Sequence, residues 1–194
     1  MLNESLRLAI VVGSVREGRF GHVAGNWIAR HAEQHGVFDV DLIDLVDLTF
    51  PNDMSRNADV EDFSARIAAA DAVIVLSPEY NHSYSGPLKV AIDSLKDEWK
   101  AKPIGFVAYG GMSGGLRAVE ALRLVFAELH AVTIREVVSF HIARSRFDEQ
   151  GNPVDREMVD FAADTMLNNL HWWALALKNA RAAHPYGEPL AVAR

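Results

Sequence analysis

The chain contains no cysteine. Disulfide bonds, thiol nucleophiles and cysteine-ligated iron–sulfur clusters are therefore excluded. No apolar run approaches the roughly 20 residues of a membrane-spanning helix, and Met1–Ser5 is too short for a signal peptide. Excess positive charge is missing too, since the net charge is −7, which disfavours binding to nucleic acid or to an anionic membrane. From these absences we expect a cytoplasmic protein.

The sequence also lacks the common motifs of catalysis by side chains. It has no H-E-x-x-H pair. The eight histidines are scattered. His31 and His35 stand four residues apart on an expected helix, and we interpret them as part of a solvated face. We therefore expect no metal ligands and no catalytic side chains.

The residues that are present fit one α/β domain over the whole chain. The 194 residues are 49 % hydrophobic and 23 % charged. Short apolar runs alternate with helical patterns, which is typical of a parallel sheet covered by helices on both faces. Strands are expected at residues 6–13, 38–45, 72–77, 102–109 and 132–140. Helices are expected at residues 21–35, 59–70, 87–95, 116–130 and 156–181, with loose tails at 1–5 and 182–194.

Five such units predict a flavodoxin-like three-layer sandwich, with the five strands in the order 2-1-3-4-5. The alternation in Phe38–Leu45 (FDVDLIDL) indicates a strand near an edge. Trp172 and Trp173 are expected to pack the last helix against the sheet or a partner subunit. Ligands of such sheets bind beyond the carboxyl ends of the strands, where the strand order reverses. The loops after the first, third and fourth strands are therefore the candidate site.

The first of these loops, residues 13–21 (GSVREGRFG), is named the phosphate loop here. It leads into a helix N-terminus, where free N–H groups and the helix dipole favour an anion. Ser14 adds a hydroxyl donor, and Arg16 and Arg19 add charged, forked donors that suit phosphate. We favour phosphate binding over the alternative, a strand-to-helix turn with solvated arginines.

The phosphate loop narrowly misses the P-loop pattern of ATPases. Gly13 and Gly18 have the spacing of that pattern, but Arg19 stands in place of its lysine. Phe20 stands in place of the hydroxyl residue that binds magnesium. The loop is therefore suited to holding a phosphate and poorly suited to activating one with a metal ion.

The second loop, residues 77–87 (SPEYNHSYSGP), is named the tyrosine loop. Its aromatic rings, amide and hydroxyl groups suit a flat heterocycle, through stacking and hydrogen bonds to the ring edge. A turn-rich surface loop with one packed tyrosine explains the composition equally well. The third loop, residues 109–115 (YGGMSGG), is named the glycine loop and has four glycines in six residues. It can approach a ring closely, or it is an ordinary flexible connection.

Together the three loops resemble the NADPH-dependent FMN reductase family. That family has a flavodoxin-like fold and includes azoreductases, quinone reductases and chromate reductases. The resemblance extends in order over residues 6–140 and is most specific in PEYN at 78–81, GPLK at 86–89 and AID at 91–93. It implies FMN as the bound cofactor and NADPH or NADH as the electron donor.

The residues that the resemblance assigns to FMN fall into three groups. The phosphate group is assigned to Ser14, Arg16, Gly18, Arg19, Phe20 and Gly21. The ring and the ribityl chain are assigned to Pro78, Glu79, Tyr80 and Asn81. The opposite wall is assigned to Gly110, Gly111 and Ser113. Related proteins often carry serine or asparagine near Phe20 and Gly21, so backbone amides or Arg19 are expected to replace those donors here.

The resemblance further implies a ping-pong oxidoreductase. NAD(P)H gives a hydride to the flavin and leaves before a quinone, an azo compound, free flavin or a similar small acceptor binds. A homodimer or homotetramer is implied, with the helices after strands three and four in the interface. Two alternatives remain: an electron carrier without a nicotinamide site, and a phosphate-binding module without redox chemistry.

The sequence shows no recognisable site for the 2′-phosphate of NADPH. The preference between NADPH and NADH therefore stays open at this point. For the FMN phosphate, we expect Arg16→Ala to weaken retention far more than Arg144→Ala.

Overall fold

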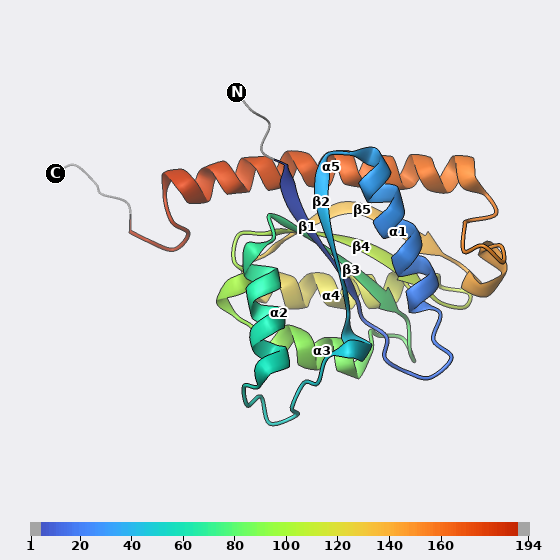
Figure 1. Cartoon of the computed structure of the whole chain (residues 1–194), viewed down its shortest axis with the longest axis horizontal. Coiled ribbons are helices and arrows are strands. Elements are labelled where there is room, and N and C mark those ends of the chain that lie inside the picture. Colours follow the sequence, from blue (N-terminus) through green and yellow to red (C-terminus); the bar gives the residue numbers. More distant parts are fainter. Residues whose placement is uncertain (1–4, 190–194) are drawn as a thin grey trace.

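A computed structural model describes residues 5–189, so the outer parts of the two expected tails, 1–4 and 190–194, lie outside the described residues (Figure 1). The sheet has five strands, all parallel to their neighbours: β1 (Leu6–Val12), β2 (Phe38–Asp44), β3 (Ala72–Pro78), β4 (Pro103–Tyr109) and β5 (Val132–Phe140). Their order is β2-β1-β3-β4-β5. The predicted flavodoxin-like topology is confirmed.

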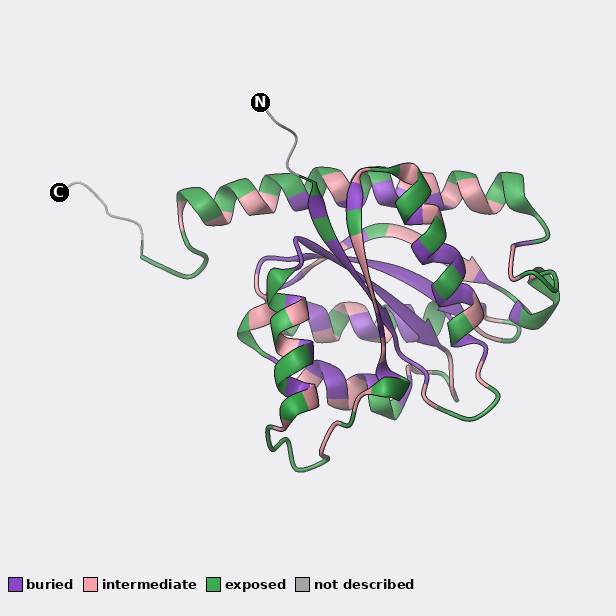
Figure 2. Ribbon diagram, viewed as in Figure 1, coloured by how far each residue is buried: buried purple, intermediate pink, exposed green. Residues whose placement is uncertain are grey.

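Five helices cover the two faces of the sheet: α1 (Gly21–His35), α2 (Ala58–Ala69), α3 (Gly86–Asp93), α4 (Leu116–Glu128) and α5 (Arg156–Ala183). One hydrophobic core lies between the sheet and helices α1 and α5. The other lies between the sheet and helices α2, α3 and α4. Strands β3 and β4 are buried at every residue, because both of their faces carry apolar side chains against helices (Figure 2). Strand β2 is less buried and lies at an edge, as predicted.

Most helix boundaries differ from the expected ones by one or two residues, and capping explains two of the starts. Helix α2 begins one residue early because the side chain of Asn57 accepts a hydrogen bond from Val60 N at 2.8 Å. Helix α3 begins at Gly86, where the Ser85 hydroxyl caps Leu88 N. Helix α5 runs two residues further than expected, to Ala183.

The C-terminal part of α5 corrects one expectation. Trp172 and Trp173 do not pack against the sheet, since 63 % and 37 % of their surfaces are exposed. Their rings instead contact one another edge to face, 5.1 Å apart. Beyond the helix, the Tyr186 hydroxyl lies 3.1 Å from Nδ1 of His130, so this part of the expected loose tail contacts the domain. Within the described residues, no helix is long and apolar enough to cross a membrane.

Candidate functional site

The phosphate and tyrosine loops meet at the carboxyl edge of the sheet. The hydroxyl groups of Ser14 and Tyr80 are 2.7 Å apart, which joins the two loops directly. The glycine loop is joined to them, because Glu79 N donates to the carbonyl of Tyr109 at 2.9 Å. The strand order thus brings together three segments that are far apart in the sequence.

The phosphate loop leaves the N-terminus of α1 free of side-chain caps. Phe20 is the N-cap residue and makes no such bond, and the first turn holds no acidic residue. At Gly21 an added Cβ would lie 2.9 Å from the Tyr109 hydroxyl and 3.0 Å from Val12 Cγ1. A side chain at this position would clash with these atoms, so glycine fits here. Without a side chain, the backbone N–H groups at the start of α1 stay accessible to an anion.

Tyr109 brings a donor to this place that the sequence reasoning did not assign. The residue ends β4 and is buried, yet its hydroxyl has no hydrogen-bond partner among residues 5–189. Burial raises the pKa of Tyr109 above its ordinary range and outweighs the lowering by the nearby Ser14 hydroxyl, which is itself bonded to Tyr80. The hydroxyl therefore keeps its proton and can donate to an anion at the start of α1. The only sequence signal was its position, last in a buried strand and next to the glycines.

The two terminal nitrogens of the Arg19 guanidinium group differ in their contacts. Its Nη2 pairs with Asp44 at the end of β2, at 2.7 Å. Its Nη1 is buried and has no partner within the described part of the chain. The ion pair therefore holds the guanidinium in place while a charged donor remains available. This arrangement fits the expectation that Arg19 replaces missing hydroxyl or amide donors.

The remaining residues of the phosphate loop differ in what they can offer. Ser14 is fully buried, and Arg16 is exposed with its guanidinium carbon 5.2 Å from the centre of the Tyr80 ring. Phe20 is buried, and its ring packs edge-on against the rings of Tyr109 and Phe147. Only the backbone of Phe20 can therefore contact a ligand.

Gly18 links the phosphate loop to a distant part of the sequence. Its φ of +63° is in the left-handed region that favours glycine. Its carbonyl accepts a hydrogen bond from Nη2 of Arg144 at 2.6 Å. Arg144, which the sequence analysis used as a remote comparison, thus lies at the phosphate loop. No local motif could have indicated this, because 126 residues separate the two partners.

Glu79 connects the tyrosine loop to the glycine loop. Its carboxylate, only 4 % exposed, pairs with the Arg117 guanidinium at 2.5 Å and accepts a hydrogen bond from Arg117 N at 3.2 Å. Burial alone would raise the pKa of Glu79, but hydrogen bonds from Ser113 and Arg117 outweigh it and lower the pKa. The side chain is thus an ionised clamp between loops, and the backbone of Glu79 remains as the part that can face a ring.

The tyrosine loop is an ordered hairpin turn. Tyr80 N donates to the carbonyl of Ser83 at 2.8 Å, and Ser83 N donates back at 3.2 Å. Asn81 and His82 form the exposed tip, with φ of +49° and +76°. Pro78, just before the turn, is buried and paired with the end of β4. A rigid turn of this kind holds its backbone donors at fixed positions.

The glycine loop is also fixed. Gly110 N donates to the carbonyl of Phe140 at 3.2 Å, and Gly114 N donates to the carbonyl of Gly111 at 3.3 Å. An added Cβ at Gly110 would lie 3.1 Å from Gly115 N. These contacts place the Gly110 backbone as a closely packed wall beside the tyrosine loop.

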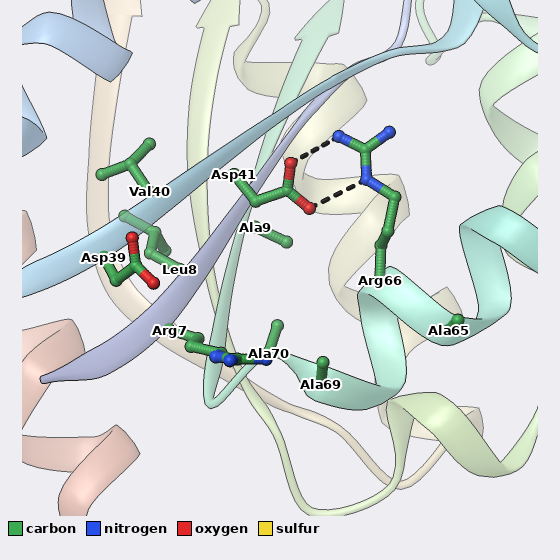
Figure 3. A pocket seen from close by; sticks show the side chains of 10 residues that line it. All are labelled: Arg7, Leu8, Ala9, Asp39, Val40, Asp41, Ala65, Arg66, Ala69 and Ala70. Carbon is green, nitrogen blue, oxygen red and sulfur yellow. Dashed lines mark hydrogen bonds and ion pairs between the residues drawn. The ribbon is translucent and has the colours of Figure 1, made fainter. Parts of the chain in front are cut away.

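A separate cavity at the amino end of the strands contains none of the expected site residues (Figure 3). It lies between β1, β2 and α2 and has a volume of about 330 Å³. Asp41 from β2 and Arg66 from α2 pair across it, with Nε of Arg66 2.8 Å from the carboxylate. These two charges satisfy each other, and none of the buried unpaired side-chain atoms found in residues 5–189 lines this cavity.

Comparison with known proteins shows which family has this arrangement. The family model described as NADPH-dependent FMN reductase matches residues 6–145. The chain belongs to that family. This FMN reductase family member is 33 % identical over 192 residues to a "Probable NADPH:quinone oxidoreductase 2" of Oryza sativa subsp. japonica, covering 90 % of this chain and 92 % of the relative. It is 30 % identical to an "FMN-dependent NADPH-azoreductase" of Staphylococcus saprophyticus, covering 68 % of this chain and 75 % of the relative.

A solved structure agrees with the fold of this FMN reductase family member. The flavoenzyme FerB of Paracoccus denitrificans, titled an NAD(P)H:(acceptor) oxidoreductase, superposes with a TM-score of 0.71. The superposition covers 88 % of this chain and 98 % of FerB, at 24 % identity. The similarity supports the architecture, whereas the family assignment rests on sequence.

Proposed function

We propose that this protein holds FMN in the crevice between its three loops and uses it to pass electrons from NAD(P)H to a small acceptor. The observation that carries the proposal is the pair of unsatisfied buried donors at the start of α1. Within residues 5–189 the Tyr109 hydroxyl and Arg19 Nη1 lack partners, beside helix N–H groups that no side chain caps. A phosphoryl group is an anion that satisfies all of these donors together. The residues present therefore fit FMN.

Each loop has a separate task in this proposal. Ser14, Arg16 and Arg19, with the backbone of residues 18–21, hold the phosphate. The backbone of residues 78–81 faces the ring edge, and Gly110, Gly111 and Ser113 form the opposite wall. FMN supplies the hydride chemistry when it is bound. The protein contributes orientation and backbone donors that stabilise negative charge on the ring, and no described side chain has to move a proton.

We propose a quinone as the preferred class of acceptor. The rice relative, whose printed name is an NADPH:quinone oxidoreductase, aligns along nine-tenths of both chains. The azoreductase relative aligns over a smaller share. Azo compounds are therefore the second acceptor to test.

The proposed state is a homodimer or homotetramer of one domain per chain, located in the cytoplasm. The exposed Leu124 on α4, with 76 % of its surface accessible, is a feature of the expected interface. Light scattering of wild type and Leu124→Glu tests the assembly. We expect a multiple of the 21.4 kDa chain mass that falls in the variant, and a monomeric wild type would contradict it.

The decisive experiment is an absorbance spectrum of purified protein, taken before and after anaerobic addition of NADPH. We expect a flavin band that bleaches with NADPH and returns when a quinone is added. A band that does not bleach would favour the electron carrier. A protein that stays colourless after addition of FMN would favour the non-redox module.

A further inference from the structure

Helix α5 carries apolar side chains on two opposite sides. The residues that pack on the sheet are Ala163, Met166, Leu167, Leu170 and Ala174. On the side turned away from the sheet, Phe161 and Trp172 expose 73 % and 63 % of their surfaces. Exposed residues run along the whole length of this helix (Figure 2). An exposed apolar surface of this kind marks a place where another molecule binds.

The outer side of α5 has the spacing of a coiled-coil seam. Its positions recur at alternating steps of three and four residues: Met158, Phe161, Thr165, Asn168, Trp172 and Leu175. We name these six residues the α5 seam. This spacing is the heptad pattern with which one helix packs along another. None of the six residues is charged, although the whole chain has a net charge of −7. A second helix is therefore the shape that fits the seam.

The order of residues in the α5 seam is self-complementary. When two copies of α5 lie antiparallel, with a two-fold axis between residues 166 and 167, Phe161 of one copy meets the partner's Trp172. In the same arrangement Met158 meets the partner's Leu175. The polar Thr165 meets the partner's Asn168 at the centre. Apolar layers thus enclose a polar layer that fixes the register, and the two copies use the same surface.

The charges beside the seam favour the antiparallel direction. One flank carries, at steps of seven residues, Glu157, Asp164, His171 and Lys178. Antiparallel pairing places Glu157 opposite the partner's Lys178. It also places Asp164 opposite the partner's His171. The other flank is uncharged and consists of Ala162, Asn169 and Ala176. In a parallel pair each charged flank would face an uncharged one, so only the antiparallel pair matches opposite charges.

The size of the surface indicates a reversible contact. Helix α5 has 28 residues, which gives a length of about 42 Å. A strip of that length and about 10 Å wide covers roughly 400 Å² per chain, about half of what each partner buries in a standard interface. Asp164 and Lys178 also pair within their own chain, with His31 and Asp71. The flank charges therefore set the direction of pairing more than its strength.

We propose that α5 pairs antiparallel with α5 of a second copy of this chain, through the α5 seam. This contact is separate from the one expected at Leu124 on α4. It also lies outside residues 6–145, which match the family model. The inference goes beyond the proposed function, because the seam takes no part in binding FMN.

Analytical ultracentrifugation over a range of concentrations tests the pairing. The Leu124→Glu protein serves as the background, so that a contact through α4 does not contribute. We expect it to form dimers as its concentration rises. Adding Phe161→Glu should raise the Kd of the dimer by at least about 100-fold, because each dimer loses two aromatic contacts.

Val46→Glu, added to the same background, is the matched control. Val46 is also an exposed apolar residue, but it lies in the turn after β2. We expect it to leave the Kd of the dimer unchanged. A background protein that stays monomeric at every concentration would overturn the proposal, and so would equal Kd values for the two added substitutions.

Mixing two variants of the background protein tests the register. Phe161→Glu and Trp172→Lys should each dimerise poorly alone. In a mixture the introduced carboxylate meets the introduced ammonium in one layer, while Trp172 still meets Phe161 in the other. Heterodimers should therefore form, and their formation would show that both variants are folded. Two variants that keep FMN but remain monomeric when mixed would contradict antiparallel pairing.

Discussion

The two ends of strand β4 differ in whether the buried polar group beside them has a hydrogen-bond partner. The Lys102 ammonium, just before β4, is buried and donates to three carbonyl groups at the end of α2. The Tyr109 hydroxyl, at the other end of the same strand, has no partner in the described residues. Of three such unpaired buried atoms in residues 5–189, Tyr109 and Arg19 supply two, and His35 at the end of α1 supplies the third.

This difference indicates that the group before β4 has a structural role, whereas the group at the carboxyl end of β4 belongs to a binding site. Unpaired buried donors cost free energy, so two of them beside an uncapped helix N-terminus indicate a place that a ligand completes. A buried lysine surrounded by carbonyls is complete already. If this comparison is right, substitutions at the two ends should affect different measurements.

The largest effect should come from Lys102→Met. Three carbonyl groups at the end of α2 would lose their donor, so we expect the free energy of unfolding to fall by about 2–4 kcal/mol, measured by denaturation of the apoprotein. Lys100→Met is the control: its ion pair with the exposed Asp97 should contribute little to stability. Equal losses in both variants would contradict the structural role of Lys102.

Arg16→Ala should have the next largest effect, on FMN retention rather than on folding. Removing a charged phosphate donor should weaken FMN binding by about 30-fold, measured by flavin fluorescence quenching. Arg144→Ala should weaken it less, because Arg144 acts on the loop through the carbonyl of Gly18. A larger loss for Arg144→Ala than for Arg16→Ala would show that the phosphate lies elsewhere.

Tyr109→Phe should weaken FMN binding by about tenfold and leave the apoprotein as stable as the wild type or more so. The removed hydroxyl has no partner among the residues that the structure describes, so its loss leaves none of them unpaired. Tyr84→Phe in the tyrosine loop is the control and should change neither quantity. A destabilised Tyr109→Phe apoprotein with normal FMN affinity would show that Tyr109 has a structural role and does not bind the ligand.

The smallest effect should come from Glu79→Gln, and it should depend on pH. The pKa of Glu79 is lowered in the folded protein, so its contribution is full above the ordinary carboxyl pKa and disappears as pH falls through the lowered value. We expect the variant to be less stable by about 1 kcal/mol at pH 7, with the difference shrinking below about pH 4.5. Chemical denaturation across this pH range measures it, and a pH-independent difference would count against the clamp.

Local patterns in the sequence predicted most of the fold. Apolar runs predicted the buried strands, because buried parallel strands need apolar side chains on both faces. Alternation of apolar and acidic residues predicted the edge strand β2. The ends of helices were less predictable, since a cap such as Asn57 acts through one hydrogen bond. The packing of Trp172 and Trp173 against the sheet was not predictable, because a large apolar residue on a long helix does not reveal which side of the helix meets the sheet. Their alternative contact, with a partner subunit, stays a prediction.

The sequence predicted the chemistry of each loop in the candidate site, but not the contacts that the loops make with distant residues. Strand order placed the three loops together, and the phosphate loop carried its own chemistry. The partners of Glu79 and Gly18 were not predictable, because Arg117 and Arg144 lie 38 and 126 residues away from them in the sequence. Tyr109 was missed because nothing in a strand sequence states whether a buried hydroxyl will be paired.

The unpaired Tyr109 hydroxyl has a consequence for the protein in the cell. A newly made chain carries the cost of that group until its cofactor arrives, so the apoprotein should melt at a lower temperature than the loaded protein. Chains that wait for FMN spend more time unfolded and are exposed to proteases. Riboflavin supply, rather than synthesis alone, should then set how much of this enzyme accumulates.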